Sequence, residues 1–582
     1  MLVSAFFLLP GLRTATAGVV VDGAEFAVNS YTTGAQTGER DAAVARLATG
    51  GFVVVWDSRT PSGSGYEIFA RSFDGSGNAV GGDLQVNSFT TGNQMRAAVA
   101  AAPDGFVVVW ESDPADGTGR SVRGRLLSGD GTPSGAEFQV NTYTTGDQYQ
   151  PSVAAEAFGG FDVVWTSAGQ DGSGSAIVSR RYDSTATPAG DEVLVNTYTT
   201  GDQYEPKVAM DDSGIGMVVW TSDGQDGDGA GVFGNLLDTA GQPLGDEFRA
   251  NENTAGDQDS PGLSADLAGR FAVVWRDRSG LDGDGDGIFL RRDPYVPSIT
   301  LQVNSYTTGD QSAPAVASNP DGDFLAVWAT PTAGGDGTEI AAQHVRVNSA
   351  TSAGEVRVNS HTPADQDAPS LAFDAAGNVV VVWQSDGRDG DGQGLAARAL
   401  KVGCPSTPLA GCRQAGAGRA SIKVSDKKKD DKDSIKWTWK RGAATDADDF
   451  ADPVSGTADY RLCIWDGSAD AQPVLNSELP PSGDCSGRPC WSALGGKGYR
   501  YKDKAASADG VQQLLLRAGD EGRSKFSAQW RGEEIPSSFA LPLTGPVEAQ
   551  LLVSDDGGVE CWASEFTRIR RSDGKQFSAT GP

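Results

Sequence analysis

The segment Met217-Val-Val-Trp-Thr-Ser-Asp-Gly-Gln-Asp-Gly-Asp-Gly229 is one copy of the pattern that decides the fold of this 582-residue chain. A short apolar run that ends in Trp recurs seven times, at intervals of 53 to 55 residues. The seven tryptophans are Trp56, Trp110, Trp165, Trp220, Trp275, Trp328 and Trp383. A residue that recurs at a fixed period of about fifty indicates one supersecondary unit copied end to end.

Each repeat contains four strand-like pieces, separated by turns rich in Gly, Asp and Ser. In the third copy these pieces cover residues 151–155, 161–165, 176–182 and 192–196. They are short and rich in β-branched residues, and they lack a 3.6-residue periodicity, which is typical of strands. The repeat therefore predicts an all-β, seven-bladed β-propeller, with an open β-solenoid as the alternative.

The ends of the repeat region predict how the ring closes. The last copy ends near Arg398 without the Glu-Phe-x-Val-Asn strand, and one such strand stands alone at residues 25–29. We expect this strand to complete the last blade, because closure removes the exposed sheet edges of an open stack. We expect the tryptophans to pack between blades, since burial of one indole removes about 150–250 Å² from water.

The amino terminus and the composition favour export. Residues 1–17 resemble a secretory signal peptide that lacks a basic n-region, and a hydrophobic first strand is the alternative. No later segment has the roughly eighteen apolar residues of a membrane helix. A formal net charge of −30 argues against nucleic acid as a partner. We expect an exported monomer without a transmembrane segment, in the periplasm, outside the cell or on its surface.

A second domain is expected after residue 400, which gives a signal peptide at 1–17, the propeller at 18–400 and a carboxy-terminal domain at 401–582. All six cysteines lie in this last part. They predict three disulfides, with Cys404–Cys412 as the expected local pair and a zinc site as the alternative. Alternating stretches such as Ile435-Lys-Trp-Thr-Trp-Lys440 predict a β-sandwich-like fold for this domain.

The acidic loops that follow the Trp strands are candidate metal sites. Carboxylates on alternate residues, with Gly between them, can turn several oxygens toward calcium. The fifth copy follows an EF-hand-like spacing from Asp282 to Asp293, although Asp replaces the final Glu and the flanks read as strands. The alternative is that the Asp-Gly pairs only form hairpin turns. The predicted calcium ligands are Asp223, Asp226, Asp228, Asp282, Asp284, Asp286, Asp293, Asp386, Asp389 and Asp391.

The sequence gives little sign of catalysis. It contains two His and no nucleophile elbow, P-loop or His-Glu-x-x-His motif, so no catalytic residue is assigned and an enzyme is not expected. The recurrent Thr-Thr-Gly-Asp-Gln segment, as at residues 144–148, is expected to fix the turn into each blade by hydrogen bonds. Contact with a sugar ligand is the alternative for this segment.

The repeat at residues 195–203 and 218–229 resembles repeats of exported bacterial proteins of uncharacterised function. That resemblance covers residues 24–400 and implies a propeller without an assigned activity. The Asp loops alone are similar, more loosely, to the calcium-loop propellers of the integrin-α type. Residues 401–582 look similar to a carboxy-terminal β domain of exported bacterial proteins.

The expected function is that of an exported, non-enzymatic binding or adhesion scaffold for a protein or glycan ligand, with calcium-stabilised loops. The alternative is a polysaccharide-acting enzyme, a glycosidase or lyase, that uses the central face of the propeller. Converging carboxylates that are unique to single blades would favour the enzyme. Near-identical blades would favour the scaffold.

Overall fold

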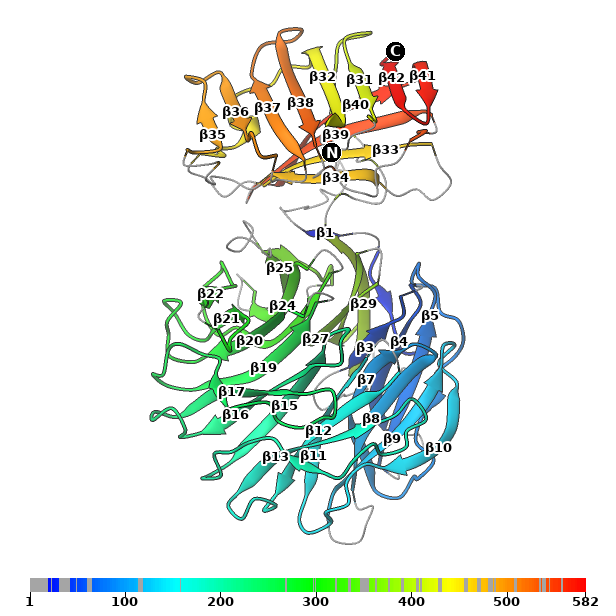
Figure 1. The fold of residues 1–582 in the computed structure, drawn as a ribbon, viewed down its shortest axis with the longest axis vertical. Helices are drawn as coiled ribbons and strands as arrows, with labels where there is room; N and C mark the ends of the chain where they lie inside the picture. The colour runs from blue at the N-terminus through cyan, green and yellow to red at the C-terminus, as the bar shows by residue number, and fades with distance from the viewer. Residues whose placement is uncertain are drawn as a thin grey trace, which may run out of the picture. The chain divides into compact units, whose positions relative to one another are not determined.

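A computed structural model describes residues 19–582 apart from short stretches, the longest of which are 31–41, 60–64, 114–118, 346–354, 468–472, 480–484 and 536–540. The chain divides into two compact units (Figure 1). One comprises residues 22–351 and 357–402, and the other comprises residues 403–582 with 1–21 and 352–356. The predicted signal peptide at 1–17 lies outside the described residues. No helix in the described part of the chain is long and apolar enough to cross a membrane.

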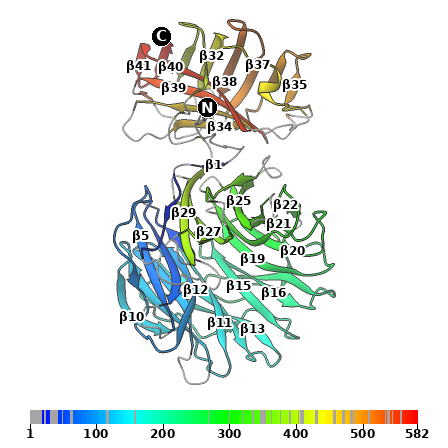
Figure 2. The ribbon, with the colours of Figure 1, turned by 180° about the vertical axis from the view of Figure 1, so that it is seen from behind.

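The first unit consists of seven antiparallel sheets (Figures 1 and 2). Six of these sheets have four strands in chain order, and the seventh has five strands, β27, β28, β29, β1 and β2, with both β1 and β2 paired to β29. The strands of the first three sheets are β3 (Ala43–Arg46), β4 (Phe52–Arg59), β5 (Tyr66–Phe73), β6 (Leu84–Gln85); β7 (Asn93–Ala102), β8 (Gly105–Asp113), β9 (Ser121–Ser128), β10 (Pro133–Gln139); β11 (Gln148–Ala155), β12 (Phe161–Ala168), β13 (Ser175–Tyr182) and β14 (Val193–Leu194).

The remaining four sheets follow the same plan. Their strands are β15 (Gln203–Met210), β16 (Gly216–Asp223), β17 (Ala230–Leu237), β18 (Phe248–Arg249); β19 (Gln258–Ala265), β20 (Phe271–Asp277), β21 (Gly287–Arg292), β22 (Thr300–Gln302); β23 (Ser312–Ser318), β24 (Phe324–Pro331), β25 (Thr338–Val345), β26 (Val356–Arg357); β27 (Gln366–Phe373), β28 (Asn378–Asp386), β29 (Gln393–Val402) and β2 (Phe26–Ala27). The seventh sheet also contains a short strand, β1 (Val19–Val21), which pairs with β29.

The seven sheets form a closed ring of propeller blades. The first strands of neighbouring blades pack against one another in turn, and β27 of the last blade packs against β3 of the first. These first strands therefore surround the axis of the ring. In the seventh blade β2 pairs antiparallel with β29, with Phe26 opposite Ala397 and Ala27 opposite Ala396. The seven-bladed propeller prediction is confirmed, and the open solenoid is excluded.

The repeated tryptophans lie on the second strand of each blade and are at most 1 % exposed. Trp165 shares a buried cluster with Val107 and Val109 of the preceding blade. Trp56 of the first blade shares one with Val382 of the last blade. The prediction that these side chains pack between blades is confirmed, because six buried clusters each combine a Trp with apolar residues of the neighbouring blade.

The second unit contains two β-sheets that face each other across one buried core. The five-stranded sheet runs in the order β30 (Arg413–Gln414), β40 (Gly558–Phe566), β39 (Val547–Asp555), β33 (Asp459–Trp465) and β34 (Pro473–Leu479). The eight-stranded sheet runs in the order β35 (Trp491–Ala493), β36 (Gly498–Lys502), β37 (Val511–Arg517), β38 (Ser524–Arg531), β32 (Ser434–Gly442), β31 (Ser421–Ser425), β42 (Gln576–Thr580) and β41 (Arg568–Asp573). One 3-10 turn, η2, covers Asp448–Phe450. The sandwich-like prediction is confirmed.

All six cysteines form disulfides, so the zinc alternative is excluded. The pairs are Cys404–Cys463, Cys412–Cys561 and Cys485–Cys490. The expected local pair Cys404–Cys412 is wrong, because each of these residues reaches a strand of the five-stranded sheet that is remote in sequence. Three disulfides suggest an oxidising compartment.

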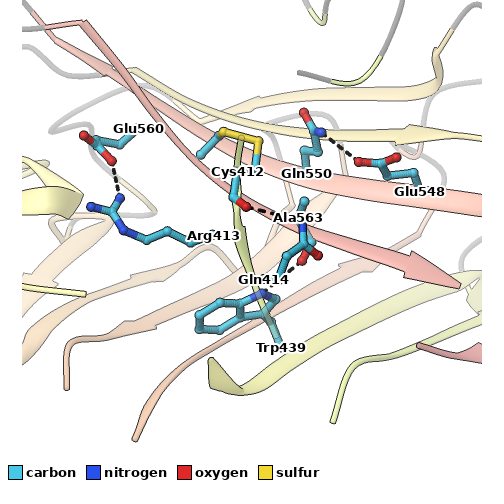
Figure 3. Close-up of a disulfide and its surroundings, with 9 residues drawn as sticks. Cys412, Arg413, Gln414, Trp439, Glu548, Gln550, Glu560 and Ala563 are labelled. Carbon is cyan, nitrogen blue, oxygen red and sulfur yellow. Dashed lines mark hydrogen bonds and ion pairs between the residues drawn. A yellow bond between two sulfur atoms is a disulfide. The ribbon is translucent and has the colours of Figure 1, made fainter. Parts of the chain in front are cut away.

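The Cys412–Cys561 disulfide lies beside an ion pair between Arg413 and Glu560 (Figure 3). The Arg413 guanidinium also lies 5.3 Å from the centre of the Trp562 ring and is ion-paired with Asp449 at 3.2 Å. This arrangement ties the segment before β30 to the edge of the five-stranded sheet.

Candidate functional site

One repeated asparagine fixes the end of every blade at which the Asp-rich loops lie. The side-chain oxygen of Asn141 accepts a hydrogen bond from the Val122 N–H at 2.8 Å, and its amide donates to the Tyr143 carbonyl at 2.9 Å. The same bond from a third-strand N–H to the side-chain oxygen occurs at Asn29, Asn87, Asn141, Asn196, Asn251, Asn304 and Asn359. Because this contact recurs in all seven blades, we assign it a structural role, and we call such repeated contacts the framework of the propeller.

The Asp and Gln of the Thr-Thr-Gly-Asp-Gln segment also belong to this framework. The Asp202 carboxylate accepts the Ser175 N–H at 2.9 Å. The Gln148 side-chain oxygen accepts the Trp165 indole N–H at 3.0 Å. In three other blades the Gln oxygen accepts instead from the repeated Asn, as Gln311 does from Asn304 at 2.8 Å. The prediction that this segment fixes the turn is confirmed.

Acidic residues of the fourth strand clamp the preceding blade. Glu137 accepts the backbone N–H groups of Ser88 at 2.8 Å and Phe89 at 3.2 Å. Glu25, beside β2 of the last blade, makes the same contacts with Ser360 and His361, which follow β26 of the sixth blade, so the clamp also holds the amino-terminal strand in the closed ring.

Two of the predicted calcium ligands, Asp282 and Asp226, contact the repeated asparagine of their blade. Asp282 accepts the side-chain amide of Asn304 at 2.9 Å and the N–H of Asp284 at 3.3 Å. Asp226 makes the corresponding contacts with Asn251 at 3.3 Å and with the N–H of Asp228 at 3.4 Å. These loop carboxylates therefore have a structural role in holding the repeated asparagine.

The EF-hand-like spacing of the fifth blade does not gather its ligands. Asp293 follows β21, and its N–H donates to Phe271 at the start of β20, at the opposite end of the strand from Asp282. Asp286 turns toward Arg276 and Arg278 instead, at 3.9 and 3.6 Å.

The other predicted ligands are equally dispersed. Asp223 faces the Tyr204 hydroxyl at 3.2 Å. Asp386 ends β28, while Asp389 and Asp391 lie outside the described residues. Within the described part of the chain, no three His, Cys, Asp or Glu side chains gather as a metal site. The calcium site stays a prediction.

A different set of residues lies near the ring axis. It is built around strained backbone positions in the first strands of the blades. In six blades the first strand is bulged just after the Gln, at a non-Gly residue with φ between 48° and 55°. These residues are Arg96, Gln150, Glu205, Ser260, Ala313 and Ala368. A bulge re-aims the side chain of the extra residue, and strain of this kind collects at functional positions. The bulge is repeated, but the side chain it presents is not.

The acidic residues that follow Trp56 and Trp110 accept the bulged backbone N–H of the next blade. Asp57 accepts the Arg96 N–H at 3.2 Å, and Glu111 accepts the Gln150 N–H at 2.7 Å. The Gln150 side chain in turn accepts the Glu205 N–H at 3.0 Å. A continuous polar chain thus runs across blades one to four.

Glu111 is the centre of the first part of this chain. Its side chain is fully buried, and its two oxygens lie 3.0 Å from Arg96 and 3.3 Å from Arg120. The Arg120 guanidinium also lies 5.0 Å from the centre of the Tyr149 ring. A buried carboxylate with two guanidinium partners is held in one geometry.

Blade five supplies the second part. Arg276 makes a bidentate pair with Asp259, at 2.8 and 3.0 Å, and Arg278 approaches the same carboxylate at 3.3 Å. Burial and the nearby Asp310 raise the pKa of Asp286. Burial likewise raises the pKa of Asp223, next to Tyr204. Glu205 interacts electrostatically with Arg276, which joins the two parts.

We call the residues of this network the axial cluster; they are Asp57, Arg96, Glu111, Arg120, Gln150, Glu205, Asp259 and Arg276. Blades six and seven contrast with it, because Ala313, Ala329 and Ala368 occupy the corresponding positions. Blade seven keeps a carboxylate, Asp367, at the position of Asp259, so small residues replace the bulged residue of both blades and the residue after Trp328.

The axial cluster was missed in the sequence, although a signal was present. Proline follows the bulged residue directly at Pro151, Pro206, Pro261, Pro314 and Pro369. Proline within a strand is confined to edge strands, strand starts and bulges, because it cannot donate to the ladder. The repeated proline on the first strand, which is an edge strand of each sheet, could therefore have pointed to the irregular position, and the variable residue before it to the cluster.

Comparison with known proteins gives structural likenesses only. No family model matches the chain, and no curated protein matches it in sequence. A protein of unknown function from Dyadobacter fermentans is similar at 12% identity and a TM-score of 0.41, over 66% of this chain and 99% of that one. The α-L-arabinofuranosidase of Fusarium graminearum with arabinobiose and the α-L-arabinanase of Penicillium chrysogenum with arabinobiose are 15% and 14% identical, with TM-scores of 0.38 and 0.36. Each match covers 53% of this chain and 93% of the enzyme. These likenesses assign no activity.

Proposed function

We propose that the propeller binds a polysaccharide at the axial cluster and that the protein works outside the cytoplasm. The observation that carries the proposal is the contrast between the repeated framework and the axial positions. Residues that hold a blade together recur in every blade. Arg96, Gln150 and Glu205 occupy one position and share no chemistry, so their side chains are not required to form the bulge.

The chemistry of the cluster suits sugar hydroxyls. Ligand sites combine a few fixed polar groups with apolar or aromatic surface. Guanidinium, carboxylate and amide groups donate or accept two hydrogen bonds in one plane. Tyr149, with Arg120 over its ring, offers a flat surface beside them. Ala313, Ala329 and Ala368 place small side chains at three of the corresponding positions in blades six and seven, which favours an elongated ligand.

A binding assay tests this proposal. Full-length protein is titrated with a panel of neutral polysaccharides by calorimetry, and the best ligand is repeated with Arg120→Ala and Glu205→Gln. We expect each variant to bind at least tenfold more weakly. Asp191→Asn, in an exposed loop between β13 and β14, is the control. Unchanged binding by both axial variants would overturn the proposal.

Glycoside hydrolysis is a second candidate, favoured by unlike carboxyl groups at the cluster. Glycosidases use one protonated and one ionised carboxyl group on either side of the bond. Asp286 has a raised pKa, while Asp259 is held by two guanidinium groups. Both carboxylates lie within 3.6 Å of the same Arg278 nitrogen. Environments that differ in this way separate acid and base roles.

The test of hydrolysis is the release of reducing ends from arabinan and other polysaccharides. Hydrolysis requires turnover that Asp286→Asn and Asp259→Asn each reduce at least a hundredfold. Binding without turnover by the unmodified protein would leave a non-enzymatic polysaccharide-binding protein.

A further inference from the structure

The eight-stranded sheet of the second unit has one buried and one exposed face. Alternate residues, such as Ile422, Trp437 and Phe526, face the core shared with the five-stranded sheet. The residues between them face outward, and most of them are basic or hydroxylated. The outer face therefore has a chemistry that the packing of the domain does not explain.

Six cations form the centre of this outer face. They are Lys423, Lys436, Lys440, Arg517, Lys525 and Arg531, and all are exposed. Arg500 and Lys502 extend the row on β36, and Arg568 and Arg571 extend it on β41. Among the outward residues of the described strands, Asp573 is the only acid, and it is hydrogen-bonded to Arg571. We call these ten cations the basic face.

The register places cations of the basic face directly opposite one another. Lys436 on β32 is opposite Lys423 on β31. Lys525 on β38 is opposite both Lys440 on β32 and Arg517 on β37. Like charges at directly opposed positions destabilise a sheet. Within the described residues, none of these five side chains has an ion-pair partner that would offset the repulsion.

The charge of the rest of the chain makes the face unusual. Residues 1–402 contain 23 Lys and Arg against 52 Asp and Glu, and the whole chain has a formal charge of −30. A strongly acidic protein that gathers cations on one flat surface attracts a polyanion to that surface alone. The cations lie about 4.8 Å apart across strands and roughly 7 Å apart along them.

We propose that the basic face binds a linear anionic polysaccharide, such as a polyuronate with one carboxylate on each sugar. Three observations favour this class over other polyanions. Ser421, Thr438, Ser527 and Gln529 lie between the cations and suit sugar hydroxyls. The basic face presents no aromatic side chain on which a nucleic-acid base can stack. Among the outward residues of its described strands Leu515 is the one large apolar side chain, and it is half-buried, whereas a bilayer-binding surface presents several exposed apolar side chains.

This site is separate from the axial cluster, and it adds a charged class of ligand to the neutral one proposed there. The axial variants Arg120→Ala and Glu205→Gln should therefore leave binding at the basic face unchanged. A failure of one proposal does not decide the other.

The experiment uses the full, oxidised chain and sodium polygalacturonate as the probe. We expect binding at 50 mM salt that weakens at least tenfold at 300 mM, because screening removes the attraction. The quadruple variant Lys423→Gln, Lys436→Gln, Lys440→Gln, Lys525→Gln should bind at least tenfold more weakly. The matched control neutralises four exposed lysines outside the basic face, Lys432, Lys497, Lys504 and Lys575, and should bind like the unmodified protein.

A thermal readout keeps the test independent of a folding failure. The quadruple variant should melt at or above the temperature of the unmodified protein, since it removes three repulsive pairs. Polygalacturonate should raise the melting temperature of the unmodified protein and not that of the variant. No binding at 50 mM salt, or equal loss in the control, would overturn the proposal. So would binding to duplex DNA, to phosphatidylglycerol vesicles or to a second copy of the chain in place of polygalacturonate.

Discussion

The Glu25 carboxylate accepts a hydrogen bond from the backbone N–H of Ser360 at 2.6 Å, across 335 positions of sequence. It also accepts the Ser360 hydroxyl at 2.7 Å and forms an ion pair with Arg388. The first and last parts of the propeller sequence are thus joined by a nearly buried carboxylate as well as by the β2–β29 ladder. Substitution of Glu25 alone therefore tests how the ring is closed.

Replacing Glu25 with Ala should destabilise the propeller by about 2–4 kcal/mol, because a charged acceptor with several partners is lost. Denaturant unfolding measures this change. Glu192→Ala removes the equivalent clamp in the middle of the ring, where Thr142 and Tyr143 are held. Only Glu25→Ala should raise amide exchange in β2 and β29. Unchanged protection of those amides would contradict the role of Glu25 in closure.

A buried carboxylate in blade three predicts a pH-dependent stability. Burial raises the pKa of Asp162 from 3.8 to about 6, although Arg181 at 3.1 Å opposes the shift. A folded pKa above the unfolded one means that the folded state binds the proton more tightly. The contribution of Asp162 is therefore fully present below pH 4 and is lost as the pH rises through 6.

The measurement compares the unfolding free energies of the unmodified protein and Asp162→Asn between pH 4.5 and 7.5. As the pH falls, the unfolding free energy of the unmodified protein should rise by about 2–3 kcal/mol relative to that of Asp162→Asn. Asp130→Asn is the control, because hydrogen bonds from Ser128 and Thr132 lower the pKa of Asp130 to about 2. Its difference should stay nearly flat in this range. A flat difference for Asp162→Asn as well would show that its pKa is not raised.

The propeller could be predicted from the sequence because the signals that define it are periodic. Each Trp recurs within the same short sequence pattern. The last repeat lacks its fourth strand, and residues 25–29 are the one copy of that strand outside a repeat. The disulfides lacked such a signal, since the partner of Cys412 is set by which strands pair in the folded sheet. The Cys412–Cys561 bond spans 149 positions, so proximity in sequence favoured the wrong partner.

The two proposed sites were harder to find for related physical reasons. The axial residues differ from blade to blade, so they form no repeated pattern in the sequence. For the basic face, the alternation in Ile435-Lys-Trp-Thr-Trp-Lys440 revealed a half-buried strand. The cations opposite Lys436 and Lys440 depend on strand order and register, which a single strand does not encode.

The disulfides differ in the loop they close, and this predicts unequal effects on stability. Cys412–Cys561 closes a separation of 149 residues, and Cys485–Cys490 closes a separation of 5. Loop-closure entropy assigns about 5 kcal/mol to the first and about 2 kcal/mol to the second. The double variants to Ala, unfolded in urea, should show this order. Equal losses would mean that strain or residual structure outweighs loop length.

The calcium prediction is open to a direct test in the fifth blade. A cation bound by the folded state alone raises the melting temperature as its concentration rises. Calcium at 5 mM should then stabilise the unmodified protein, and the triple variant Asp282→Asn, Asp284→Asn, Asp286→Asn should lose the shift. The variant should also be less stable in chelator, because an Asn at 282 has one acceptor oxygen, whereas Asp282 accepts from both the Asn304 amide at 2.9 Å and the Asp284 N–H at 3.3 Å. A loss of stability that is the same with and without calcium would assign Asp282 to the framework alone.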